Sequence, residues 1–337
     1  AMPPTHPMQT VVDTELQGRG PALIRQYEAH AAAQAARVPM GTVQAVETPV
    51  RAKTLTWGVL QTCNPEHLGS YWEDCEALYR GGHHLLCNKT LMERLFPSHN
   101  AELANIYADR VKRAFYLPYS GKIVDILTAS LEGDPIRLVA EADEEEVPEE
   151  WAEWSQEVTA DGASLEHTHS LHNLVCEAIR AAQVKQVAWI AADLPNVAPE
   201  VAGAATSLLD QERLGLKDPY LCLVDAGEVI DWDQDDDGTL LYVWHHTTSQ
   251  RRVDPTKGRG TILHTWTLWD AFGWVKYELA VDPKNPPNAE TPVQWKAEGP
   301  HPFKVVPWVR FVLPDGLWTM GKLASIAKEH FNKRCAL

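Results

Sequence analysis

The sequence has no apolar run that approaches the ~20 residues needed to cross a bilayer, and no signal peptide is visible at its start. The six cysteines are scattered and form no CxxC pair, so we interpret them as reduced thiols rather than as a disulfide framework. Basic residues are also scarce, because 30 Lys and Arg stand against 46 Asp and Glu, for a formal charge of −16. Tight nucleic-acid binding usually needs a basic face, so strong DNA binding by the whole surface is disfavoured.

Catalytic signatures are missing as well. The chain contains no GxSxG, P-loop, Rossmann glycine fingerprint or HExxH motif. Its many Asp and Glu residues allow numerous acid–base pairs, and nothing in the sequence selects one of them. We therefore expect a protein that is not an enzyme and that needs no cofactor. The composition, 45% hydrophobic and 23% charged, is that of a globular protein, and 337 residues suffice for one large or two ordinary domains.

The most unusual stretch, residues 229–246, carries five aspartates within residues 231–237. The opening of a calcium-binding EF-hand loop is reproduced by Asp233, Asp235, Asp237 and Gly238. The twelfth loop position is Trp244, which cannot supply the closing carboxylate. The flanks are rich in Val, Ile, Leu, Tyr and Trp, so the pattern predicts a β-hairpin with an Asp/Gly turn. Calcium binding by this turn stays an alternative.

Helical patterns dominate the first half of the chain after an N-terminal arm at residues 1–56. Three helices are predicted from patterns within 65–82, 98–117 and 119–135; the first ends at a double glycine, the second is capped by Ser98 or Asn100, and the third ends near Gly133. A fourth helix is predicted over 165–185, capped by Ser164 and followed by a strand at 186–195.

The second half predicts β structure from residue 220 to residue 311. A second hairpin is expected from 261–270 and 274–281, then a Pro-rich loop at 284–302 and a short strand within 303–313. Residues 316–337 predict an amphipathic helix that stops without a Gly cap or a Pro terminator, as though the chain were cut there.

Two groups of residues could bind a metal. Zinc-type ligands are Cys63, Cys75, His83, His84 and Cys87, although their spacing fits no short zinc knuckle. Three histidines near a helix start, with no acidic partner in view, are His167, His169 and His172. The simpler interpretation is half-buried thiols in the first group and a solvated helical turn in the second, so no metal site is predicted.

Basic residues gather at two places in this acidic chain. A Gly/Pro loop carries Arg251, Arg252, Lys257 and Arg259, and the last helix carries Lys322, Lys328, Lys333 and Arg334. On that helix an apolar stripe is predicted from Leu323, Ile326, Ala327 and Phe331. The loop is either a solvated turn or a contact with the DNA backbone or an acidic neighbouring subunit.

The order of these segments resembles the portal proteins of tailed bacteriophages. The resemblance covers residues 65–337 and is carried by five stretches, none of them catalytic: 71–86, 107–138 with its GKIVDIL helix, 164–195, 218–244 and 305–337. It implies an α+β fold with an N-terminal helical part, a β-hairpin-rich second half and the start of a long stem helix. Residues 57–316 would be the wing, mainly helical over 57–215 and mainly β over 216–316, and residues 317–337 would begin the stem. It also implies that the Asp-rich stretch is a hairpin turn.

Members of that family form a ring, generally of twelve subunits, at one capsid vertex of the virion. The resemblance implies a non-catalytic protein, assembled in the host cytoplasm, through whose ring DNA is packaged and ejected. Its expected partners are further copies of itself, the terminase large subunit, the major capsid or scaffolding protein, the head–tail adaptor and transient double-stranded DNA, with no membrane. Two alternatives remain: a calcium- or zinc-binding globular protein or hydrolase, and another structural protein of the phage head or tail.

Overall fold

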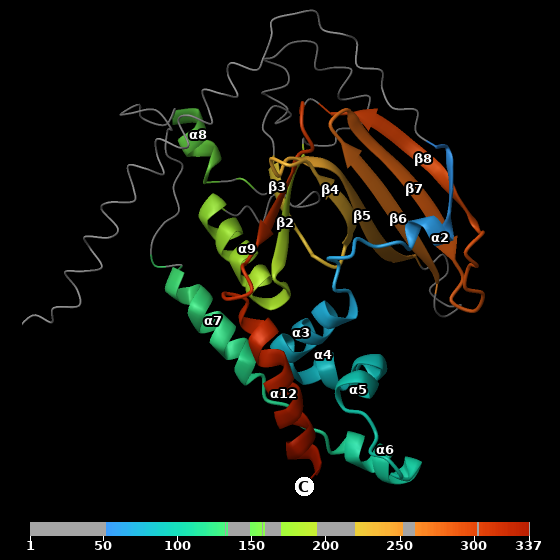
Figure 1. Cartoon of the computed structure of the whole chain (residues 1–337), viewed down its shortest axis with the longest axis vertical. Helices are drawn as coiled ribbons and strands as arrows, with labels where there is room; N and C mark the ends of the chain where they lie inside the picture. The colour runs from blue at the N-terminus through green and yellow to red at the C-terminus, as the bar shows by residue number, and fades with distance from the viewer. Residues whose placement is uncertain are drawn as a thin grey trace, which may run out of the picture. The chain divides into compact units, whose positions relative to one another are not determined.

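The computed structural model describes residues 52–131, 133, 149–156, 158, 170–193, 220–251, 260–301 and 303–336 (Figure 1). The predicted cap Ser164, the histidines His167 and His169, and nearly all of the predicted arm lie outside these residues. The α+β class is confirmed, since helices and two antiparallel sheets are both present. No helix within the described ranges has the length and apolar character of a membrane span.

Most helices of the chain precede the sheets. In order the helices are α2 (Trp57–Leu60), α3 (Ser70–Arg80), α4 (Gly82–Leu86), α5 (Lys89–Leu95), α6 (Ala104–Lys112), α7 (Tyr119–Leu131), α8 (Glu149–Trp154), α9 (Leu171–Lys185) and α12 (Thr319–Ala336). Of these, α3, α7 and α9 pack with the last helix, α12. The predicted stop of α3 is confirmed at Gly81, whose φ of 58° suits glycine. A shared core joins α3 to α7 and α12 through Leu78, Leu95, Phe96, Val124, Met320 and Phe331. We call α3–α7, α9 and α12 the helical layer.

Helix α6 begins later than its sequence predicts. Neither Ser98 nor Asn100 caps it, and the first helical residue is Ala104. The carboxylate of Glu102 accepts a hydrogen bond from the His99 backbone N–H at 2.9 Å, and Ala101 adopts a positive φ of 67°. These two features close a turn at residues 99–102, which delays the start of the helix.

Helix α9 also has a different cap from the predicted one. The side chain of Ser170 accepts the backbone N–H of Asn173 at 3.3 Å, so the helix begins at Leu171. The strand predicted after this helix is confirmed as β2 (Val187–Asp193).

The larger sheet is antiparallel with the order β1–β8–β7–β6–β5–β4. Its strands are β1 (Thr54–Thr56), β4 (Val229–Gln234), β5 (Leu240–Arg251), β6 (Thr261–Asp270), β7 (Gly273–Val281) and β8 (Pro292–Pro300). Both predicted hairpins are confirmed by the pairing of β4 with β5 and of β6 with β7.

Two predictions about this sheet are wrong. The Pro-rich loop predicted at 284–302 contains β8, which pairs with β7 on one side and β1 on the other. Pro292 and Pro300 stand at the two ends of β8, where a missing N–H costs little in ladder hydrogen bonds. Strand β1 lies inside the predicted arm but is hydrogen-bonded into the sheet, with Thr54 opposite Gln294.

The smaller sheet has the order β3–β2–β9, with β3 at Tyr220–Val224 and β9 at Trp308–Val312. Helix α9 covers one face through Ala178 and Ala182, which pack with Ala188 and Leu313. On the other face, Trp189 of β2 meets Trp232 of β4 with ring centroids 5.3 Å apart. The central strand β2 therefore lies between the helical layer and the larger sheet.

A buried lysine ties these parts together. Lys185 at the end of α9 pairs with Glu76 of α3 and, at 2.5 Å, with Asp225 in the turn between β3 and β4. Its side chain is 9% exposed. Since a buried ammonium needs compensating charge, the two carboxylates are structural requirements of this position.

Candidate interaction surface

Helix α7 packs against the core through its small residues rather than through its large apolar ones. The residues that point into the core are small or short, namely Ser120, Gly121, Val124 and Thr128. A Cβ at Gly121 would collide with the backbone carbonyl oxygen of Tyr79, so glycine is what lets α7 approach α3 closely. The first turn is held by Tyr116, whose hydroxyl donates to the Leu78 carbonyl at 2.8 Å and lies 3.2 Å from the Ser120 hydroxyl.

The large apolar side chains of α7 are left open. Between 43% and 70% of each residue is exposed for Tyr119, Ile123, Ile126, Leu127 and Leu131, and Ile326 of α12 is 62% exposed beside them. We call these six residues the α7 face. In α7 the large apolar residues are exposed and the small residues are buried, which is the reverse of the usual burial preference of a helix. Such a face is typical of a surface that another macromolecule covers.

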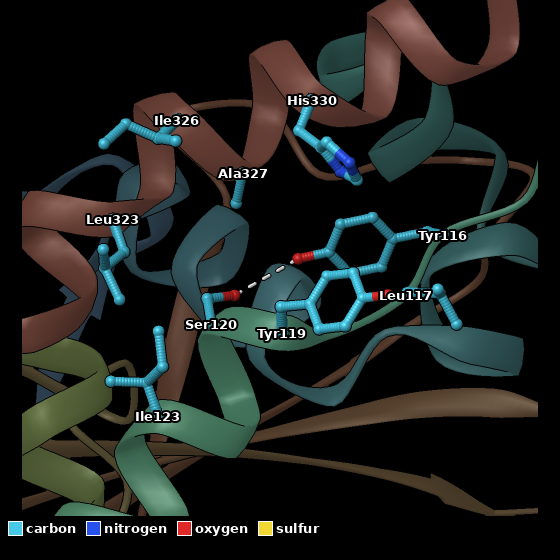
Figure 2. A pocket seen from close by; sticks show the side chains of 9 residues that line it. All are labelled: Tyr116, Leu117, Tyr119, Ser120, Ile123, Leu323, Ile326, Ala327 and His330. Carbon is cyan, nitrogen blue, oxygen red and sulfur yellow. Dashed lines mark hydrogen bonds between the residues drawn. The ribbon is translucent and has the colours of Figure 1, made fainter.

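A groove of about 240 Å³ runs along this face between α7 and α12 (Figure 2). Ile123 comes from α7, Leu323, Ile326 and Ala327 come from α12, and Tyr116 and Tyr119 close one end. His330 lies over Tyr119, with ring centroids 6.2 Å apart at an angle of 69°. Burial raises the pKa of the Tyr116 hydroxyl, so this group is a neutral hydrogen-bonding group at physiological pH. The lining suits apolar side chains of a protein partner.

The predicted apolar stripe of α12 is partly correct. Phe331 is fully buried and Ala327 packs against the core, but Leu323 and Ile326 line the groove instead. The residues that anchor the helix on its inner side are Met320, Ala324 and Phe331. The predicted stripe therefore lies at the edge of the buried side of the helix, with Leu323 and Ile326 outside the core.

The predicted basic contacts are described in part. Lys328 and Lys333 lie on α12, and Lys333 pairs with Glu329 at 2.5 Å on the exposed surface, which lowers the pKa of that carboxyl. Arg251 ends β5, and for it and for Arg334 the structure describes the backbone alone. Arg252, Lys257 and Arg259 lie outside the described residues. Three of the seven, Lys328, Lys333 and Arg334, thus lie on one helix, and no contact with the residues of the loop is described.

The carboxylate of Asp235, at the centre of the Asp-rich turn, stabilises the backbone of the turn. Asp235 accepts the backbone N–H groups of Asp237 and Thr239 at 3.0 and 2.8 Å, and Gly238 takes a φ of 82°. Asp233 accepts the N–H of Gln234 at 2.9 Å. These bonds account for Asp and Gly at the tip of a hairpin without a cation.

The candidate zinc ligands are spread over different surroundings. Burial raises the pKa of the Cys75 thiol to about 12, whereas Cys63 and Cys87 are exposed. Cys87 contacts the ring of His83 at 3.1 Å on α4. Across the described ranges, no three His, Cys, Asp or Glu residues are arranged as a metal site.

Sequence reasoning missed a second buried ion pair, which holds α6 in place. Arg110 donates two hydrogen bonds to Glu102, at 2.8 and 2.9 Å, and a third to the Pro97 carbonyl at 2.9 Å. Its guanidinium lies 4.1 Å from the centre of the Phe96 ring. The hydrogen bond from Arg110 lowers the pKa of Glu102 to about 2. A signal was available, because Arg110 follows Tyr107 by three residues on the predicted helix, a spacing at which a guanidinium can contact an aromatic ring.

Comparison with known proteins adds no relative: the sequence matches no model of a known protein family and none of the curated proteins.

Proposed function

We propose that this protein is a subunit of the portal ring of a tailed bacteriophage, a structural and non-catalytic assembly at one capsid vertex. The observation that carries the proposal is the α7 face with its groove beside α12. A ring subunit needs a surface of this kind. Its neighbours cover apolar side chains at each subunit contact, and these side chains are exposed when the chain is viewed alone.

Further support comes from the order of the sequence segments and from their place in the fold. The stretches that resemble portal proteins span α3 with α4, most of α6 with α7, α9–β2, β3 with the Asp-rich hairpin, and β9–α12. Helix α12 follows β9 after six residues, 313–318, and packs along α3, α7 and α9. In the proposed ring, α12 is the beginning of the stem helix.

The proposed partners follow from this role. They are further copies of the chain, the terminase large subunit, the major capsid or scaffolding protein, the head–tail adaptor and double-stranded DNA in passage. A formal charge of −16 suits a channel that conducts DNA without holding it, because few phosphate contacts mean little friction.

Negative-stain electron microscopy of the purified protein, together with its mass in solution, tests the proposal. Closed rings with a central hole and a symmetry near twelve are expected. Open filaments or small rings of other symmetry would favour another structural protein of the phage head or tail. Single subunits at every concentration would overturn both.

A second test concerns DNA. The assembled ring is expected to bind double-stranded DNA weakly, with an affinity that changes little with salt concentration. Steeply salt-dependent, tight binding would mean many phosphate contacts and would contradict the role of a conduit. The metal-binding alternative has its own test, because a bound ion stabilises the folded state: chelator or added calcium would then shift the melting temperature.

A further inference from the structure

We propose that the open edge of β9 binds an extended segment of a partner protein, which joins the smaller sheet as a fourth strand. The segment carries β-branched side chains on both faces and a net positive charge. We use the name β9 edge for the side of residues 308–312 that faces away from β2. This surface is separate from the α7 face, and the inference goes beyond the proposed function.

The backbone of β9 offers hydrogen-bonding groups on the side that faces away from β2. Leu313, the residue after β9, donates its N–H to the Gln186 carbonyl next to β2 at 2.9 Å. Because inward and outward residues alternate along an antiparallel strand, Arg310 and Val312 face outward. Their N–H and C=O groups therefore lie on an edge where no described strand pairs with them.

The β9 edge lacks the protection that the other three sheet edges have. Strand β4 carries Asp231 and Asp233, and its pairing with β5 has two register shifts. Strand β1 is three residues long, and β3 is bonded on its outer side, where the Leu221 N–H donates to the Val158 carbonyl at 2.7 Å. Strand β9 has five consecutive pairs with β2, without a shift or a proline. Its regular backbone can therefore pair with an extended chain.

The exposed side chains of β9 determine which residues suit the segment. Val309 is 61% exposed and Val312 is 42% exposed. Val309 lies opposite Ile190 on the face that α9 covers, and Val312 lies opposite Val187 on the face toward the larger sheet. A strand beside β9 thus has an apolar neighbour on each face, which favours β-branched residues on both of its own faces.

The charges around β9 favour a positive segment. The guanidinium of Arg310 pairs with Glu66 and lies 4.7 Å from the centre of the Trp232 ring, so it is directed toward the larger sheet and away from the edge. Glu66 and Asp315, which follows the strand, are both exposed acids. The whole chain has a formal charge of −16. A positive segment is therefore attracted, whereas a second copy of this acidic chain is repelled.

The size of the edge also favours a single segment over a folded copy. Helix α9 covers one face of the smaller sheet and Trp232 of β4 covers the other, so the sheet edge of a second copy would bring its own layers against them. Five residues bury on the order of 300 Å² on each partner, well below the ~800 Å² per partner of a stable protein interface. An extended segment at a sheet edge gains its affinity from main-chain hydrogen bonds instead.

The probe is a fluorescein-labelled peptide with the sequence Lys-Arg-Val-Thr-Val-Thr-Val, and fluorescence anisotropy measures its binding to the full chain. We expect saturable binding to one site per chain. A second peptide has the same charge and carries proline in place of the central valine. It should bind at least ~10-fold more weakly, because proline lacks a backbone donor and is disfavoured inside a sheet. Equal binding of the two peptides would mean that charge alone attracts them, and the inference would fail.

Two substitutions at one position test the edge itself. Val312→Pro removes an outward N–H that takes no part in the ladder with β2, and it should weaken probe binding at least ~10-fold. Val312→Thr is the matched control, because it keeps the N–H and a β-branched side chain, and it should bind the probe within about twofold. If Val312→Pro lowers the melting temperature, Val309→Lys takes its place, since a lysine at this exposed edge position repels the positive probe.

The remaining outcomes also decide the inference. It is wrong if the unmodified chain does not bind the probe, or if the edge variants bind it as well as Val312→Thr does. It is also wrong if the chain forms dimers that Val312→Pro abolishes while the probe stays unbound, because a second copy then occupies the edge. Electron microscopy scores ring formation separately, so failure of the probe leaves the portal proposal standing, and absence of rings leaves the β9 edge to be judged by the probe.

Discussion

The larger sheet buries large apolar side chains that have counterparts in the helical layer exposed to water. On the sheet, Trp266 is fully buried, and the rings of His246, His264 and Trp57 surround it at centroid distances of 4.8 to 5.5 Å. In the helical layer, α7 buries Gly121 and exposes Ile126 at 70%. The sheet therefore buries these large rings within one chain, whereas the helical layer leaves part of its apolar surface exposed.

The difference lies in what covers each element. Strand β6 has neighbours on both edges, and α2 lies against its face, so a large indole finds contacts in every direction. Helix α7 has a core on one side alone, where close approach to α3 requires small residues. Its large residues contribute little to the stability of the monomer until another surface removes them from water.

The largest expected effect is on the sheet. Trp266→Ala should lower the free energy of unfolding by about 4 kcal/mol, because it empties a fully buried site in a close-packed cluster. Trp295→Ala on β8 is the control, since Trp295 is 38% exposed, and it should cost less than half as much. Urea denaturation measures both. Equal losses would contradict the view that the sheet is closed around Trp266.

The junction between the layers comes next. Lys185→Met should cost about 2 kcal/mol, because it removes a buried ammonium from Glu76, which keeps its pair with Arg80, and from Asp225, which is 43% exposed. Lys112→Met, which breaks an exposed pair with Asp109, should change stability by less than ~1 kcal/mol. A more stable Lys185→Met protein would mean that packing outweighs charge at this position.

The histidine stack should make the sheet sensitive to acid. His246 and His264 share a hydrogen bond of 3.0 Å, and burial, with the neighbouring His264 and His245, lowers the pKa of His246 to about 4. The folded state thus binds fewer protons than the unfolded state between pH ~6.5 and 4. Stability is therefore complete above this window and falls as the pH drops through it.

The expected loss from His246 across that window is on the order of 2 kcal/mol after allowance for its partial exposure. His246→Gln should remove most of this pH dependence, as measured by urea denaturation at a series of pH values. An unchanged slope in the variant would show that other groups cause the acid sensitivity.

The smallest effect on stability is expected on the α7 face. Ile126→Glu should change the free energy of unfolding of the monomer by no more than ~0.5 kcal/mol, because the side chain already faces water. The difference between this small loss of stability and the large loss for Trp266→Ala would show that the sheet buries its large side chains within the chain and that α7 does not. A loss above ~2 kcal/mol would show that the helical layer, like the sheet, is closed within the chain.

Local sequence patterns were sufficient where one short segment decides the structure. The Asp/Gly turn at 235–239, the double glycine after α3 and the alternation along β6 and β7 each specify backbone geometry or the buried face within a few residues. Strand β8 was missed because its terminal prolines are typical of loops, and its place in the sheet depends on pairing with β7 and β1. Pairing partners distant in sequence leave no local signal.

The sequence by itself thus determined the α+β class, both hairpins, the strand after α9 and the terminal amphipathic helix. The tertiary structure alone decided which side of α7 is buried, since periodicity favours Ile and Leu inside while the approach of α3 admits only the small side of the helix at Gly121. It also decided that Arg110 and Lys185 find their carboxylates in the interior. Burial depends on what the rest of the chain places opposite a residue, and one segment read alone does not contain that information.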